Sequence, residues 1–163
     1  MKRFVLLVAF ALTAGCGGMG NASAPADPAA YQKLTQDVVA RVATHRANAT
    51  GAETVSACVT EHTRYDAEVR PMLEKMQSQS GGMDSCMMQM GRSGDADLTA
   101  TCGSMMSELD GHKTDACASA DVAVDTNEAV RHCAAMEKWL AAANDRASYL
   151  AGSMGNMSGG RCK

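Results

Sequence analysis

Two stretches of the chain repeat apolar side chains at helical spacing, and each stretch includes one histidine. In residues 52–77 the repeating positions are Val55, Cys58, Val59, His62, Asp66, Val69, Leu73 and Met76. In residues 96–120 they are Leu98, Cys102, Met105, Met106, Leu109, His112, Ala116 and Ala120. Steps of three and four residues place side chains on one face of an α-helix. The two stretches therefore predict a pair of amphipathic helices, each burying a histidine.

Successive helices of a compact helical domain usually pack antiparallel, and this sets a register for the pair. One alignment levels three pairs of side chains: Cys58 with Cys117, His62 with His112, and Asp66 with Glu108. In each helix a histidine and a carboxylate then lie one turn apart on the same face. Imidazole nitrogen and carboxylate oxygen are suitable ligands for zinc, copper(II) or iron. The sequence thus predicts a transition-metal site at His62, Asp66, Glu108 and His112.

An ordinary structural role is the alternative for these histidines. A buried imidazole needs only a hydrogen-bond partner, and Asp66 or Glu108 offers one. A second group, His45, Glu128 and His132, is expected to gather if the first and last helices are neighbours. That group is more typical of a solvated cap and ion-pair cluster than of a set of metal ligands.

The fold class expected for the whole chain is all-α. Helices are predicted at about residues 28–49, 52–79, 95–120 and 126–154. Joined mostly by short loops, they would form an up-down-up-down four-helix bundle over residues 28–154, braced by disulfides. Pro71 predicts a kink in the second helix, and the Ser- and Gly-rich residues 78–82 predict a loop after it.

The N-terminus has the pattern of an export signal. Lys2 and Arg3 precede an apolar run, residues 4–12, which is too short to span a bilayer as a permanent helix. The segment LTAGC, residues 12–16, then resembles the lipobox of bacterial lipoproteins, in which the cysteine becomes the lipid-modified first residue of the mature protein. The resemblance covers residues 1–16 alone.

This resemblance implies a cellular location and a division of the chain into segments. Residues 1–15 would be a cleaved signal peptide, Cys16 the lipidated residue, and residues 16–27 a flexible tether. Gly17 stands where an aspartate would retain many lipoproteins at the inner membrane. The resemblance therefore implies a lipid anchor in the outer membrane, with the domain facing the periplasm.

Charge and missing motifs narrow the function further. Without residues 1–15, 13 of the 15 basic side chains remain against 18 acidic ones, a formal charge of −5. An acidic chain without a basic cluster is a poor candidate for nucleic acid. The sequence has no G-x-S-x-G, no phosphate loop, no C-x-x-C-H for haem and no H-E-x-x-H. We therefore expect neither an enzyme nor a haem, nucleotide or nucleic-acid binder.

Cysteine usage predicts disulfides, because an exported chain meets an oxidising compartment. Besides Cys16 there are six cysteines: Cys58, Cys86, Cys102, Cys117, Cys133 and Cys162. The helix register favours a Cys58–Cys117 bridge, with Cys133 as the competing partner of either. It also places three cysteines at each end of the bundle, so they cannot all pair locally. Either one cysteine at each end stays free, or Cys162 in a flexible tail, residues 155–163, pairs elsewhere.

A methionine-rich stretch is a second candidate metal site. Its soft side chains are Met83, Cys86, Met87 and Met90, predicted to lie in a connecting loop. Thioether and thiolate ligands select Cu(I). The alternative is that methionine fills core gaps, since both phenylalanines lie in the signal, and that Cys86 forms a disulfide.

Two functions fit these features. The first is an outer-membrane-anchored periplasmic lipoprotein whose helical bundle binds a transition metal for storage, sensing or delivery. The alternative is a structural or adaptor lipoprotein that binds another envelope protein and no metal. The metal content of the purified protein distinguishes them.

Overall fold

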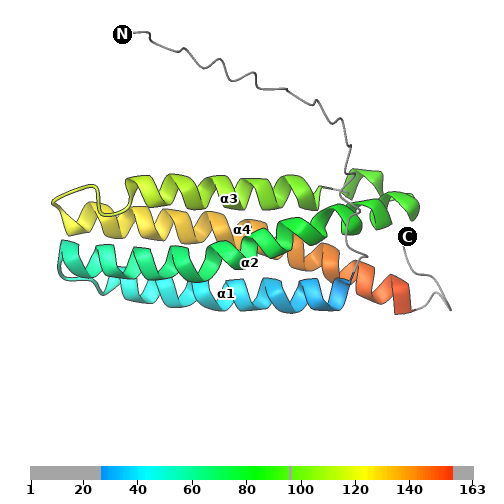
Figure 1. Ribbon diagram of the computed structural model, residues 1–163, viewed down its shortest axis with the longest axis horizontal. Helices are drawn as coiled ribbons and strands as arrows, with labels where there is room; N and C mark the ends of the chain where they lie inside the picture. Colours follow the sequence, from blue (N-terminus) through cyan, green and yellow to red (C-terminus); the bar gives the residue numbers. More distant parts are fainter. Residues whose placement is uncertain (1–26, 96, 156–163) are drawn as a thin grey trace, which may run out of the picture.

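The computed structural model describes residues 27–95 and 97–155, and the regular structure in these residues is entirely helical. Its elements are α1 (Pro28–Thr50), α2 (Val55–Gln89), the 3-10 turn η1 (Ser93–Asp95), α3 (Leu98–Asp115) and α4 (Val122–Gly155). The four long helices lie side by side (Figure 1), and α1 and α3 each pack against both α2 and α4. The prediction of an all-α fold with four helices is confirmed.

Side-chain caps fix where the first two helices begin. The Asp27 carboxylate accepts a hydrogen bond from the Ala30 amide at 3.0 Å, and Pro28 occupies the first turn of α1. The Thr54 hydroxyl accepts one from the Ala57 amide at 3.2 Å and caps α2. Each cap satisfies an amide that has no partner inside its own helix.

Helix α2 is longer than the sequence predicted, and the loop expected at residues 78–82 is wrong. The helix continues to Gln89, with Pro71 inside it, and Figure 1 shows it bending along its second half. Its buried face runs on through Met76, Met83 and Met87, which are at most 1% exposed. Burying such a side chain contributes about 1.5–3 kcal/mol, whereas a glycine inside a helix costs about 1 kcal/mol. Packing therefore outweighs the poor helix propensity of Gly81 and Gly82.

Asp84 ties the extended end of α2 to the start of α3. Its buried carboxylate accepts hydrogen bonds from the Leu98 amide at 2.8 Å, the Thr99 amide at 2.9 Å and the Thr99 hydroxyl at 2.7 Å. Asp97, at the N-cap position itself, makes no side-chain cap hydrogen bond. A residue of the preceding helix thus caps α3.

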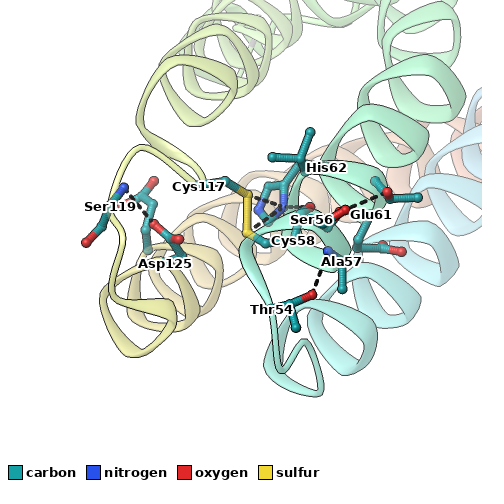
Figure 2. Close-up of a disulfide and its surroundings, with 12 residues drawn as sticks. Thr54, Ser56, Ala57, Cys58, Glu61, His62, Cys117, Ser119 and Asp125 are labelled. Carbon is teal, nitrogen blue, oxygen red and sulfur yellow. Dashed lines mark hydrogen bonds between the residues drawn. A yellow bond between two sulfur atoms is a disulfide. The ribbon is translucent and has the colours of Figure 1, made fainter.

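The predicted Cys58–Cys117 disulfide is confirmed, with the two Cα atoms 6.0 Å apart. It joins the first turns of α2 to the segment after α3 (Figure 2). Within the described residues Cys102 and Cys133 are free and buried. The expectation of one free cysteine toward each end of the bundle agrees with these positions.

The predicted signal peptide, the lipobox-like segment, Cys162 and most of the predicted tail lie outside the described residues. Among the helices that are described, none combines the length and apolar character needed to cross a bilayer.

Candidate metal centre

All four histidines of the chain gather at one end of the bundle. His45 lies near the end of α1, His62 near the start of α2, His112 in the last turn of α3, and His132 in the first half of α4. All are buried, the most exposed being His62 at 9%. The ring of His62 lies 4.7 Å, between centroids, from those of His45 and His112. The two groups predicted separately from the sequence are one cluster.

Three of these imidazoles place ring nitrogens around a common point. One ligand nitrogen from each of His45, His62 and His112 lies within 4.8 Å of the other two. The closest pair is His45 Nε2 and His112 Nε2, 3.2 Å apart. Zinc–nitrogen bonds of about 2.0–2.1 Å in tetrahedral geometry separate two ligand nitrogens by about 3.3–3.4 Å. The spacing of this pair suits a shared metal ion.

The Nδ1 atom of each ring lies within hydrogen-bond distance of an acceptor. The three contacts are His45 Nδ1 to Glu61 at 3.0 Å, His62 Nδ1 to the Cys58 carbonyl at 2.8 Å, and His112 Nδ1 to Glu128 at 3.3 Å. An acceptor at Nδ1 selects the tautomer that carries its proton there, which leaves a lone pair on Nε2. Metal-binding histidines in proteins are oriented in this way.

Burial keeps the imidazoles of His45 and His112 neutral. It lowers the pKa of His45 to about 4 and that of His112 to about 3, and nearby imidazoles lower both further. When each Nδ1 donates a hydrogen bond to the neighbouring carboxylate, both Nε2 atoms, 3.2 Å apart, carry a lone pair. The Nε2 atom of His62 is also buried and has no hydrogen-bond partner. A bound cation would satisfy all three nitrogens.

The carboxylates behind the rings are ionised. Burial would raise the pKa of Glu61, but hydrogen bonds from Arg64, His45 and Asn48 outweigh it and the pKa is lowered. A hydrogen bond from Arg131 lowers the pKa of Glu128. A negative charge at Nδ1 makes an imidazole a better electron donor to a metal at Nε2.

Asp66 and Glu108, predicted as ligands, are held elsewhere. Asp66 pairs with Arg70 at 2.7 Å and Lys113 at 3.3 Å, and these hydrogen bonds lower its pKa although burial opposes the shift. Glu108 pairs with Arg131 at 2.8 Å. Neither carboxylate belongs to the group of converging nitrogens. Basic side chains within reach neutralise them, which the apolar periodicity did not reveal.

His132 is buried too, and the prediction of a solvated cap is wrong for it. Its Nδ1 lies 3.2 Å from Glu108 and its Nε2 lies 3.1 Å from the Tyr65 hydroxyl. Its ring stacks on that of His112 with centroids 3.8 Å apart. Both nitrogens of His132 have hydrogen-bond partners, and His132 is not in the convergent group of three histidines.

Sequence reasoning missed Glu61 and set His45 and Glu128 apart from the metal site. The sequence did contain one signal that relates the two groups: Glu128 and His132 repeat the E-x-x-x-H spacing of Glu108 and His112. The two pairs cross in the structure, with Glu128 on His112 and Glu108 on His132. Periodicity within one helix does not disclose such exchanges between helices.

A pocket between α2 and α3 reaches the cluster from outside. Its volume is ≈ 220 Å³, and both His62 and His112 line it. Val59 and Lys113, also in its lining, are exposed. An ion or a small ligand therefore has a path to two of the three imidazoles.

The soft side chains proposed as a second site lie on a helix and not in a loop. Met83, Cys86 and Met87 are on α2 with at most 1% exposure, and Met90 is its C-cap. Cys86 is disulfide-bonded and so offers no thiolate. The buried sulfur atoms of Met83 and Met87 belong to the hydrophobic core.

No family model, curated protein or solved structure matches this chain.

Proposed function

We propose that this protein binds a divalent transition-metal ion through the Nε2 atoms of His45, His62 and His112. The observation that carries the proposal is the arrangement of three buried rings. Each Nδ1 has an acceptor, the Nε2 atoms of His45 and His112 lie 3.2 Å apart, and a ring nitrogen of His62 lies within 4.8 Å of both of the other histidines' ligand nitrogens. Imidazole ligands suit zinc, copper(II) and iron(II). Three protein ligands leave room for water or another small ligand from the adjoining pocket. A buried ion that exchanges through a pocket suits storage, sensing or delivery.

The test is calorimetry and thermal unfolding of the oxidised protein with zinc, copper(II) and iron(II). We expect one ion per chain and a rise in Tm, because the metal binds the folded state. Replacing His45, His62 or His112 with alanine should remove the rise. His132→Ala is the matched control: it alters the same cluster but removes no ligand, so the rise should persist.

Absence of binding by the wild type, or an undiminished rise in His62→Ala, would contradict the proposal. The histidines would then be core residues, and the adaptor function would be favoured.

We also infer that the helices alternate up and down. Contacts between α1 and α4 join Gln32 to Ser148 and Arg46 to Glu137, so residue numbers rise along one helix as they fall along the other. Contacts between α2 and α3 show the same opposite order, with His62 beside His112 and Asp84 bonded to Leu98. The two helices of each pair are therefore antiparallel. Alternation brings the ends of α1 and α3 beside the starts of α2 and α4, where the four histidines lie.

We further propose that Cys16 carries lipid and holds the domain at the outer membrane, facing the periplasm. The support is the signal-like N-terminus and its lipobox-like end. Cys16→Ser should release the protein from the membrane fraction. A wild type recovered wholly in the soluble fraction, or a variant that stays with the membrane, would overturn this.

A further inference from the structure

The Cys58–Cys117 disulfide lies directly against His62, one of the proposed metal ligands (Figure 2). The Sγ atoms of Cys58 and Cys117 are 3.5 Å and 3.4 Å from His62 Nδ1. Two sulfurs and one His62 nitrogen thus form a second convergent group, which shares His62 with the three-histidine group. While the bridge is closed, neither sulfur is a thiolate, and the thiolate is the form that binds metals.

We propose that reduction of this disulfide opens a second metal site, formed by the thiolates of Cys58 and Cys117 with Nδ1 of His62. The site would take a thiophilic ion such as zinc. The sulfur site stands on its own geometry, whereas its competition with the three-histidine centre rests on the proposed function.

The redox step needs a dithiol reductant. The reductant passes two electrons and two protons to the bridge, so that its S–S bond breaks and each cysteine becomes a thiol. The reductant closes to its own disulfide. A divalent ion then replaces the two thiol protons, which pass to solvent.

The distances suit such a site. Tetrahedral zinc, with bonds of about 2.3 Å to sulfur and 2.0–2.1 Å to nitrogen, places sulfur and nitrogen ligands about 3.5–3.6 Å apart. Both sulfurs already lie near this distance from His62 Nδ1. Cys117 has a φ of 58°, a region that residues other than glycine rarely adopt. Opening the bridge frees Cys117, which follows α3, to adjust around the ion.

One imidazole links the two sites. In the oxidised protein Nδ1 of His62 donates to the Cys58 carbonyl, and Nε2 carries the lone pair. Binding metal at Nδ1 moves the ring proton to Nε2, which can then no longer act as a ligand. The ring can serve one site at a time. Reduction would therefore move the ion from the histidine centre to the sulfur site, with one ion per chain in both states.

Access favours this pair over the other thiols. Cys117 and His62 both line the ≈ 220 Å³ pocket, so a reductant and an ion can reach them. The free thiols of Cys102 and Cys133 are fully buried, and burial raises the pKa of each.

The experiment uses cobalt(II) as the probe, because thiolate ligands add a charge-transfer absorption that imidazoles do not. The purified protein is titrated oxidised, and again after dithiol reduction and removal of the reductant without oxygen. We expect one ion in each state, with the thiolate absorption only after reduction. Its absence from the reduced protein, or two ions bound after reduction, would overturn the corresponding half of the proposal.

Two double variants separate the sites. His45→Ala with His112→Ala should bind no cobalt when oxidised, and one ion with the thiolate absorption when reduced. Cys58→Ser with Cys117→Ser should bind one ion without that absorption in both states, and this binding also shows that the variant folds. A thiolate absorption that persists in the cysteine variant would place the ion on other cysteines and sink the inference. Loss of cobalt binding from the oxidised wild type alone would instead defeat the three-histidine function.

Discussion

Glu61 and Glu128 determine which ring nitrogen of His45 and His112 is available to a metal. Each accepts from the Nδ1 of a histidine on another helix, Glu61 from His45 and Glu128 from His112. The opposite tautomer would direct a ring lone pair at a carboxylate whose lowered pKa keeps it charged. The carboxylates that matter most at this centre are therefore those behind the rings.

Glu128→Gln should weaken zinc binding by about 10–100-fold, the usual effect of losing an outer partner of a metal-binding histidine. The glutamine is nearly isosteric but removes the negative charge opposite His112 Nδ1. Isothermal titration at neutral pH measures the change.

Glu137→Gln is the matched control on the same helix. Glu137 pairs with Arg46 between α1 and α4, and no histidine of the described residues forms a hydrogen bond or ion pair with it. Its affinity for zinc should equal that of the wild type. An equal loss in both variants would mean that net charge, and not the bond to His112, sets the affinity.

For individual helices, the predicted bounds were wrong where a helix depends on packing against, or capping by, a residue of another helix. The apolar stripes located α1, the first part of α2, and α3, because the period of a buried face is written in one stretch of sequence. The Ser- and Gly-rich residues 78–82 were mistaken for a loop, since propensity was weighed there without the burial of Met83 and Met87. The cap that Asp84 supplies to α3 comes from across a turn, beyond any local pattern.

Asp84→Ala should lower the free energy of unfolding by about 2–4 kcal/mol. The change leaves the buried Leu98 amide and the Thr99 amide without their acceptor, while the Thr99 hydroxyl keeps Ser80 Oγ at 3.0 Å. A lost cap and an unsatisfied buried donor each cost about 1–2 kcal/mol. Urea denaturation of the oxidised protein measures the loss.

Asp97→Ala is the comparison, because Asp97 occupies the N-cap position but makes no cap hydrogen bond. Its ion pair with Arg146 is partly exposed, so its removal should cost less than about 1 kcal/mol. If Asp97→Ala proved the more damaging change, the assignment of the cap to Asp84 would be wrong.

Across the whole molecule, the only histidine contacts that could be predicted from the sequence are those between the consecutive helices α2 and α3. One register for α2 and α3 predicted both the disulfide and the contact of His62 with His112. Bringing His45 into the same cluster requires knowing how α1 packs against the α2–α3 pair, which no single-helix pattern contains. The merged cluster also collects three imidazoles that burial keeps neutral, and this has a consequence for stability.

The stability of the metal-free protein should fall steeply as the pH drops below about 6.5. Unfolded histidine has a pKa of about 6.5, whereas burial lowers the folded-state pKa of His45 to about 4 and those of His112 and His132 to about 3. Between these values the unfolded chain binds more protons than the folded one, so the free energy of unfolding decreases with decreasing pH. The contribution is complete above pH 6.5 and is lost as the pH falls toward 4 and then 3.

Urea denaturation with a chelator present, from pH 7.5 to 4.5, measures this loss. Three protons taken up together give a slope that approaches about 4 kcal/mol per pH unit, since each proton contributes about 1.4 kcal/mol. His132→Gln removes one of the three titrating groups without removing a proposed ligand, so its slope should be smaller by about one third. A free energy of unfolding that stays flat between pH 6.5 and 5 would show that the imidazoles are not buried in neutral form, and the lone-pair argument for a bound cation would lose its basis.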